Sequence, residues 1–201
     1  MQISFTKKIP VNTCNIYDKR RRKFVEATVY EIDCKDKSDI DYIKGMKGNW
    51  IYKDQISYGI ERKHNRVTGE NALFWKHAKE QGIEDNGYYS LEGPNEEIIC
   101  VCETEPFGRE VDISFLESAK GKRYKYAGQT MLASIANNIF GSGQILTVKA
   151  PANSAMGFYE DKCGFRKNQK YFGYEMSQED MQGFIQRTEE KTRGKILNCQ
   201  G

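Results

Sequence analysis

The sequence lacks the features that mark membrane and secreted proteins. No stretch approaches the roughly 18 consecutive apolar residues that a membrane-spanning helix needs. The first eight residues contain no apolar core of the kind found in a signal peptide. The net charge of the 201-residue chain is only +3, which gives no general reason to expect a nucleic-acid partner. We therefore expect a cytoplasmic protein without a membrane partner, and a nucleic acid is left open but not favoured.

Metal ligands and structural disulfides are also scarce. The chain has two histidines, His64 and His77, and no C-x-x-C pair among its six cysteines. A zinc site usually needs four clustered cysteine or histidine ligands, so we expect no metal. Cys100 and Cys102 lie two residues apart in an expected strand, where both thiols face one side and pack.

The charged fraction of 29% and the hydrophobic fraction of 38% are ordinary for a globular domain with a real core. Within it, 111–165 is the most informative stretch. Val111 to Leu116 alternates as a strand, with Val111, Ile113 and Phe115 on one face and Asp112, Ser114 and Leu116 on the other.

A basic turn follows this strand and ends at Ala127-Gly128, where a helix with apolar residues at helical spacing begins. The unpaired N–H groups of a helix start attract anions, and nearby cations strengthen that attraction. The pattern is typical of a phosphate cradle, although a solvated turn gives the same pattern. The cations of the turn are Lys120, Lys122, Arg123 and Lys125.

A second strand and a short helix come next. Gln144 to Ala150 reads as a buried strand, which we expect to lie parallel to the Val111 strand because a helix connects the two. Asn153 is the expected N-cap of a helix over Ser154 to Cys163, and Gly164 is its expected C-terminal stop.

These motifs resemble those of the GNAT superfamily of acetyl-CoA-dependent N-acetyltransferases. Arg123 to Gly128 fits the superfamily pattern Arg/Gln-x-x-Gly-x-Gly/Ala, except that Tyr126 replaces the first glycine. Asn153, followed by Phe158 to Phe165, resembles the superfamily's Asn and Phe-Tyr-Glu-Lys-x-Gly-Phe signature with one residue inserted. The resemblance covers about residues 86–176.

The resemblance implies an α/β fold of the α+β type, in one domain over residues 1–201. Its central sheet is expected to be mixed and mostly antiparallel, with helices on both faces and a parallel, splayed strand pair at the cofactor site. Residues 1–85 would be a variable part that shapes the acceptor site, 86–176 the cofactor-binding core, and 177–201 a C-terminal helix and tail.

The resemblance also implies direct transfer of an acetyl group from acetyl-CoA to a primary amine of a small molecule or protein. A homodimer is left open. Tyr126 is expected to keep an ordinary φ and to point its ring away from the phosphates. The expected coenzyme A contacts are Leu116, Ser118, Arg123, Tyr124, Lys125, Tyr126, Ala127, Gly128, Gln129, Asn153 and Tyr159.

Acetyl transfer to an ammonium requires a base, and the departing thiolate requires an acid. Asp112 falls where some relatives carry a glutamate base, while Glu117 and Glu103 compete with it for this role; an exposed strand carboxylate explains Asp112 about as well. Tyr159 matches the tyrosine that protonates the coenzyme A sulfur, and its alternative is a packed aromatic beside Phe158.

The rest of the chain predicts further elements. We expect a strand over Val25 to Ile32, a three-stranded antiparallel meander whose third strand is the Val111 strand, a last strand over Tyr171 to Met176, and a final helix capped by Ser177. Before the meander we expect a short helix from Ser38 and a longer one over Glu70 to Gln81. Five aromatic residues are more typical of the core than of an acceptor wall: Trp50, Tyr52, Tyr58, Phe74 and Trp75.

Two further functions stay open. The tyrosine at position 126 suits a non-catalytic protein that binds an acyl-CoA without turnover. The run Lys19 to Lys23 suits an RNA- or protein-directed acetyltransferase, although a solvated turn is the simpler interpretation of that run.

Overall fold

The computed structural model describes residues 8–32, 86–119, 123–149, 151–169 and 173–199. The helices expected from Ser38 and over Glu70 to Gln81, and the five aromatic residues from Trp50 to Trp75, lie outside these ranges. The described elements are β1 (Ile9–Asp18), β2 (Lys23–Glu31), β3 (Gly87–Glu92), β4 (Ile98–Phe107), β5 (Glu110–Ser118), β6 (Tyr124–Lys125), α3 (Ala127–Ile139), β7 (Ile145–Val148), η1 (Asn153–Ala155), η2 (Phe158–Cys163), β8 (Arg166–Asn168), β9 (Gly173–Met176), α4 (Gln178–Thr192) and β10 (Leu197–Asn198).

The strands form one mixed sheet in the order β10-β1-β2-β3-β4-β5-β7-β9-β8, and β6 pairs with β1 off this path. β5 and β7 are parallel, whereas the other paired strands of the described part are antiparallel. This confirms the predicted mixed, mostly antiparallel sheet. The β3–β4–β5 meander and the crossover through α3 are also as predicted.

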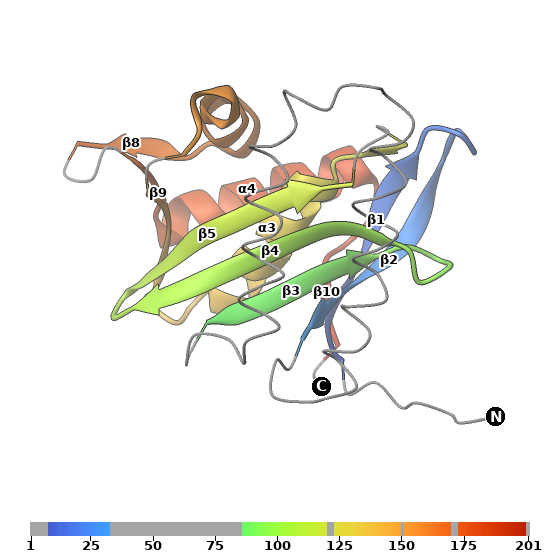
Figure 1. Ribbon diagram of the computed structural model, residues 1–201, viewed down its shortest axis with the longest axis horizontal. Coiled ribbons are helices and arrows are strands. Elements are labelled where there is room, and N and C mark those ends of the chain that lie inside the picture. Colours follow the sequence, from blue (N-terminus) through green and yellow to red (C-terminus); the bar gives the residue numbers. More distant parts are fainter. Residues whose placement is uncertain (1–7, 33–85, 120–122, 150, 170–172, 200–201) are drawn as a thin grey trace, which may run out of the picture.

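The two long helices, α3 and α4, lie together on one face of the sheet (Figure 1). α3 buries Met131, Leu132 and Ile135 against the strands, as its helical apolar spacing predicts. Ser177 caps α4, because its hydroxyl accepts a hydrogen bond from the Asp180 amide at 3.2 Å. No helix in the described ranges is both long enough and apolar enough to cross a bilayer.

An irregularity in β5 changes which residues share a face. Glu103 pairs with Phe115, whereas the next residue of β4, Thr104, pairs with Ile113, so Ser114 is an extra residue in β5. The strict alternation predicted for Val111 to Leu116 is therefore wrong beyond Ile113. Leu116, rather than Phe115, joins the core against which α3 packs.

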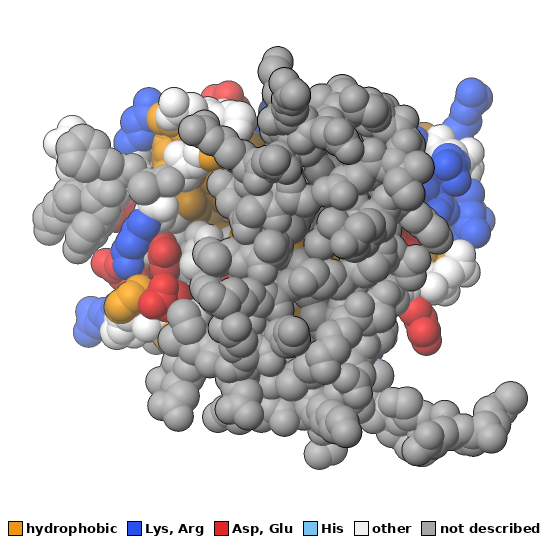
Figure 2. All heavy atoms as spheres, in the orientation of Figure 1, with side chains coloured by type: hydrophobic (Ala, Val, Ile, Leu, Met, Phe, Trp, Pro, Cys, Tyr) orange, Lys and Arg blue, Asp and Glu red, His pale blue; other side chains and the backbone are white. Residues whose placement is uncertain are grey.

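The N-terminal hairpin consists of β1 and β2. Val25, Ala27 and Val29 of β2 are buried together, as their spacing predicts. The run Lys19 to Lys23 forms the turn of this hairpin and the first residue of β2, and its side chains are exposed. Basic side chains gather at this end of the molecule (Figure 2).

The C-terminal end of the chain differs from its prediction. Residues 177–201 are expected to form a helix and a tail, and α4 continues to Thr192, so little of this stretch is left as a tail. The chain then returns to the sheet as β10, which pairs with β1. A two-residue strand has no periodicity, so no pattern in the sequence indicates it.

Candidate active site

The parallel strands β5 and β7 separate soon after they meet. They pair at only three positions, Glu110 with Ile145, Val111 with Leu146 and Asp112 with Thr147. β5 continues to Ser118, and among the described strands none pairs with that part of its β7-facing edge. This confirms the expected splay. An extended ligand could bind the backbone of this edge as an added strand would.

The start of α3 lies beside this edge. Neither a capping side chain nor an acidic residue satisfies the first turn of α3. The Tyr126 carbonyl accepts the first helical hydrogen bond, from the Thr130 amide at 2.8 Å. The amides of Ala127, Gly128 and Gln129 therefore have no intrahelical partner, and together with the helix dipole they form an anion site.

Tyr126 itself adopts a left-handed backbone, with φ 70° and ψ 5°. The expectation of an ordinary φ at this position is wrong. The chain makes the turn that glycine usually makes in the superfamily pattern, but with a bulky residue, for which this conformation is unfavourable by about 1–2 kcal/mol.

Gly128 lies where the two neighbouring elements come closest to α3. A Cβ atom at Gly128 would lie 3.1 Å from Cζ of Phe158 and 3.5 Å from Oγ of Ser118. Phe158 of η2 and Ser118 of β5 thus form the walls of a narrow cradle whose floor is the start of α3. Phe158 belongs to the motif Phe158 to Phe165, but no pattern in the sequence predicted a site role for it.

The loop after β7 differs from its prediction. Asn153 is exposed and lies inside the 3₁₀ turn η1, whose N-cap is Ala152, so the expected N-cap role of Asn153 is wrong. Phe158–Cys163 forms a π-helix rather than part of a regular α-helix, and Gly164 ends it with φ 84° as predicted. Gln129 fixes this segment to α3, because its Nε2 donates to the Lys162 carbonyl at 2.9 Å.

The side chain of Tyr159 is held among other aromatic rings. Its ring meets those of Phe158 and Phe165 edge-on at 5.3 and 5.6 Å and stacks on Tyr174 at 6.4 Å. The residue is buried, and burial raises the pKa of its phenol above the ordinary value of about 10. The phenol is therefore protonated at neutral pH, the state that a proton donor requires.

Asp112 occupies the last paired position before β5 and β7 separate. It is buried, and its Oδ1 accepts a hydrogen bond of 2.8 Å from the Thr147 hydroxyl. Burial raises the pKa of Asp112, while the Thr147 hydrogen bond and the nearby Lys149 lower it in part.

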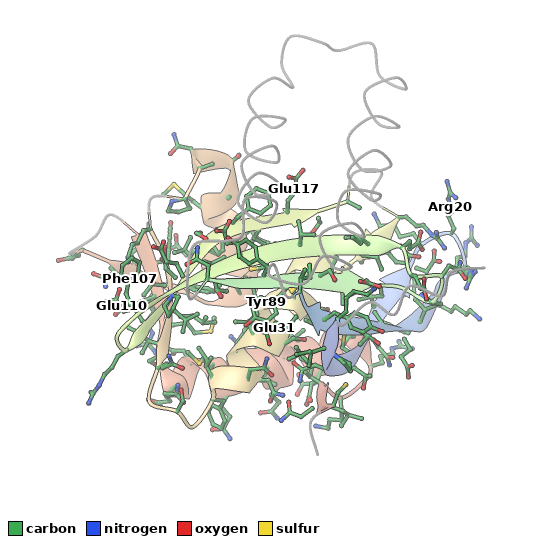
Figure 3. All side chains as sticks on the ribbon, turned by 60° about the horizontal axis from the view of Figure 1, so that its bottom comes forward. Arg20, Glu31, Tyr89, Phe107, Glu110 and Glu117 are labelled. Carbon is green, nitrogen blue, oxygen red and sulfur yellow. The ribbon has the colours of Figure 1, made fainter. Side chains whose placement is uncertain are left out.

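The other two candidate bases share a face of the sheet with Asp112. Alternate residues of β4 point to one face of the sheet, and residues paired across two strands share a face. On this face the pairs of β4 with β5 are Val101 with Glu117, Glu103 with Phe115, and Glu105 with Asp112. A regular strand would place residues 112 and 117 on opposite faces, so the extra residue in β5 brings the two carboxylates together. Figure 3 shows Glu117 pointing away from the side of the sheet that carries α3 and α4.

The Arg123 guanidinium binds two carboxylates of the protein. It donates to Asp18 at 2.7 and 3.2 Å and to Glu97 at 2.9 and 3.0 Å. The Tyr124 hydroxyl also donates to Glu97, and the Arg123 guanidinium lies over the Tyr124 ring at 4.7 Å. We call these four residues the Arg123 network.

The side chains of the loop before α3 contact neighbouring parts of the protein. The side chains of Arg123 and Tyr124 bind Asp18 and Glu97, and Lys125 lies 5.5 Å from the centre of the Tyr17 ring. All three are thereby tied to neighbouring strands and turns of the protein. A phosphate contact by Arg123 stays a prediction, but its guanidinium already has partners that orient the loop.

We expect the Arg123 network to make stability depend on acidic pH. The hydrogen bond from Arg123 lowers the pKa of Asp18 to about 2. An aspartate whose pKa is lowered in the folded state stabilises the fold at pH values above its pKa in the unfolded chain, which is about 3.9. This stabilisation is lost as the pH falls through about 2. Asp18→Asn should lower the melting temperature at pH 7 by roughly 5 °C and should flatten its fall between pH 4 and pH 2. Thermal melts across this range with parallel profiles for both proteins would contradict this assignment.

The cysteines in the described ranges are free thiols, and four of the five are buried. Burial raises the pKa of the Cys100 thiol to about 12, which makes it a packing residue rather than a nucleophile. In the described ranges, no group of three or more cysteine, histidine or acidic residues has the arrangement of a metal site.

No protein-family model and no curated protein matches the chain. Similar solved structures include N-acetyltransferases. The PaiA N-acetyltransferase of Thermoplasma acidophilum, in complex with coenzyme A, is 14% identical with a TM-score of 0.48, over 75% of this chain and 98% of that one. The spermidine N-acetyltransferase of Vibrio cholerae, in complex with CoA and spermine, is 14% identical with a TM-score of 0.46, over 78% and 98%. The catalytic domain of a Tetrahymena histone acetyltransferase, in complex with coenzyme A, is 13% identical with a TM-score of 0.45, over 86% and 89%.

Proposed function

We propose that this protein transfers the acetyl group of acetyl-CoA to a primary amine. The observation that carries this proposal is the juxtaposition of the open edge of β5 with the uncapped start of α3. The first suits an extended amide-bearing arm, and the second suits a pyrophosphate. Coenzyme A combines these two groups in one molecule. The space that the cofactor would enter lies between Phe158 and Ser118, where a Cβ atom at position 128 would intrude.

The residues of the cradle have distinct roles in this proposal. The first-turn amides of α3 would bind the pyrophosphate, and the backbone from Leu116 to Ser118 would bind the pantetheine arm. Acetyl-CoA supplies an activated thioester, so the protein needs only to position the amine and to move protons. Asp112 would accept a proton from the ammonium through a water molecule, and Tyr159 would give a proton to the departing sulfur.

We expect Asp112→Asn to separate catalysis from stability. Turnover should fall by about 10²-fold at low pH, where unassisted amine deprotonation is rare, and much less above the pKa of the amine. Because burial raises the pKa of Asp112, its charge destabilises the fold once the pH exceeds that pKa. The variant, whose amide oxygen can still accept from Thr147, should therefore melt no earlier than the wild type at pH 7.

The pH–rate profile and the melting temperature of both proteins check this prediction. An equal loss of rate at every pH would assign Asp112 a structural role. Glu117→Gln and Glu103→Gln, measured in the same way, would show whether either of the competing carboxylates is the base.

The proposed function is tested by a screen of polyamines, amino acids and peptide N-termini with acetyl-CoA. The readouts are thiol release and a mass increase of one acetyl group on the acceptor. Stabilisation by acetyl-CoA without thiol release from any amine would instead support a non-catalytic acyl-CoA-binding protein. If acetyl-CoA neither stabilises the protein nor releases its thiol with any amine, both functions are contradicted.

A further inference from the structure

A cavity lies at the basic end of the molecule. It has a volume of about 450 Å³. We call it the basic groove, and the residues that line it are Tyr17, Arg22, Lys23, Phe24, Lys125, Tyr126 and Arg193. They come from the β1–β2 hairpin, from β6 and the residue after it, and from the end of α4, so the groove depends on the folded chain.

The basic groove concentrates positive charge. Four of its seven lining residues are cations, and none of the seven is acidic. Lys19, Arg20 and Arg21 extend the charge along the hairpin turn, where Figure 3 shows Arg20 pointing outward, although Arg21 approaches Asp18 at 3.8 Å. Since the net charge of the whole chain is only +3, the rest of the chain is net negative. This concentration exceeds what a single phosphate group requires.

Backbone strain is concentrated in the same place. Among the described residues, four that are not glycine have a left-handed φ: Arg22 at 52°, Glu96 at 56°, Tyr126 at 70° and Arg193 at 53°. Three of the four line the basic groove. Each such residue is unfavourable by about 1–2 kcal/mol, and such strain tends to persist at functional sites.

Two aromatic rings of the groove hold its cations. Lys125 lies over the Tyr17 ring at 5.5 Å, and Arg193 lies over the Phe24 ring at 5.4 Å. Tyr17 and Phe24 also contact each other edge-on at 5.2 Å. These contacts orient two cations from different parts of the chain toward one cavity.

The third ring, that of Tyr126, differs from the other two. It is half-buried, and no ring, cation or hydrogen-bond contact of its side chain occurs in the described part of the structure. Glycine would make the same turn without strain. A tyrosine at this position is explained if its ring supplies a flat surface for a ligand.

We propose that the basic groove binds single-stranded nucleic acid. A base stacks on Tyr126, and successive phosphates lie along Arg22, Lys23, Lys125 and Arg193, with the hairpin turn extending the track. An electropositive groove with an aromatic platform is the arrangement that single strands require. An acidic peptide would use the cations but not the ring.

The test is the binding of a short fluorescein-labelled single-stranded RNA to the full chain, measured by fluorescence anisotropy. We expect the logarithm of the association constant to fall with the logarithm of the salt concentration, with a slope of about −0.7 for each phosphate bound. The double variant Arg22→Glu, Arg193→Glu should lower affinity by at least about 10-fold and make this slope shallower. Lys167→Glu on β8 is the matched control and should bind as the wild type does.

Tyr126→Gly tests the platform separately. It should lower RNA affinity by about 10-fold. Because glycine suits the left-handed backbone, this variant should not melt earlier, so unfolding cannot explain the loss of binding.

Three results would overturn the proposal. The first is RNA binding that is equal in the wild type, Tyr126→Gly and the charge-reversal variant. The second is competition by polyglutamate as strong as that by unlabelled RNA, which would indicate an acidic protein. The third is no RNA binding together with tighter binding of coenzyme A than of its 3′-dephospho form, a difference that the charge reversal abolishes. That result would assign the groove to the nucleotide end of coenzyme A.

Discussion

Replacing Tyr159 with phenylalanine is expected to lower turnover by about 10²- to 10⁴-fold, the range for one positioned acid. The substitution removes one oxygen and keeps the ring. The contacts with Phe158, Phe165 and Tyr174 that hold this ring should therefore survive. Acetyl-CoA affinity, measured by calorimetry, and the melting temperature should hardly change.

Tyr174→Phe is the matched control for this variant. Tyr174 is also buried, stacks on Tyr159, and has its hydroxyl 3.4 Å from Glu160. Removal of the Tyr174 hydroxyl should leave turnover within about 3-fold of the wild type. A proton donor must lie within hydrogen-bond reach of the sulfur that it protonates, and this role is assigned to Tyr159. If Tyr159→Phe melts much earlier and each folded molecule turns over normally, Tyr159 is a packing residue and the acid must be sought elsewhere.

Gly128→Val is expected to lower the affinity for acetyl-CoA by at least about 100-fold. The Cβ atom of the new side chain would lie 3.1 Å from Phe158, which is tighter than nine in ten such contacts. Phe158 must therefore shift, and the valine side chain occupies space in the cradle. The loss of two charge-assisted hydrogen bonds of about 1.5 kcal/mol each gives this magnitude.

Calorimetry on the folded variant measures this loss. Gly183→Val on α4 is its control, since a Cβ atom there would meet only the flexible end of Arg187, at 3.1 Å. Wild-type affinity in Gly128→Val would remove the start of α3 as the phosphate site and, with it, the main support for the proposed reaction.

The sequence predicted the elements that depend on local patterns. Strand and turn signals identified the meander, alternation identified β2, helical spacing identified α3, and Ser177 and Gly164 marked the ends of helices correctly. The parallel pairing of β5 with β7 followed from the helix that connects them, because parallel strands are joined by crossover connections that are usually helical. These signals lie within a few residues of the structure that they specify.

The errors have a common physical origin in contacts between distant segments. The hydrogen bond from Arg123 to Asp18 joins residues 105 positions apart, so no local pattern in the sequence predicts the Arg123 network. The extra residue at Ser114 depends on the register with β4. The left-handed φ of Tyr126 is imposed where β6 joins β1 on one side and α3 begins on the other. Local propensity opposes that conformation, and the tertiary structure overrides it.

The pairing of β1 has a consequence for how the chain is made. β1 pairs with β2 directly, with β6 across more than a hundred residues, and with β10, where Asn12 donates to Asn198 at 2.7 Å across 186 residues. During synthesis on the ribosome, one edge of the N-terminal hairpin therefore stays incompletely paired until Leu197 and Asn198 emerge. Until then it is an exposed strand edge of the kind that recruits other chains. Nascent chains halted before Leu197 should consequently depend on chaperones more than chains that include β10 do.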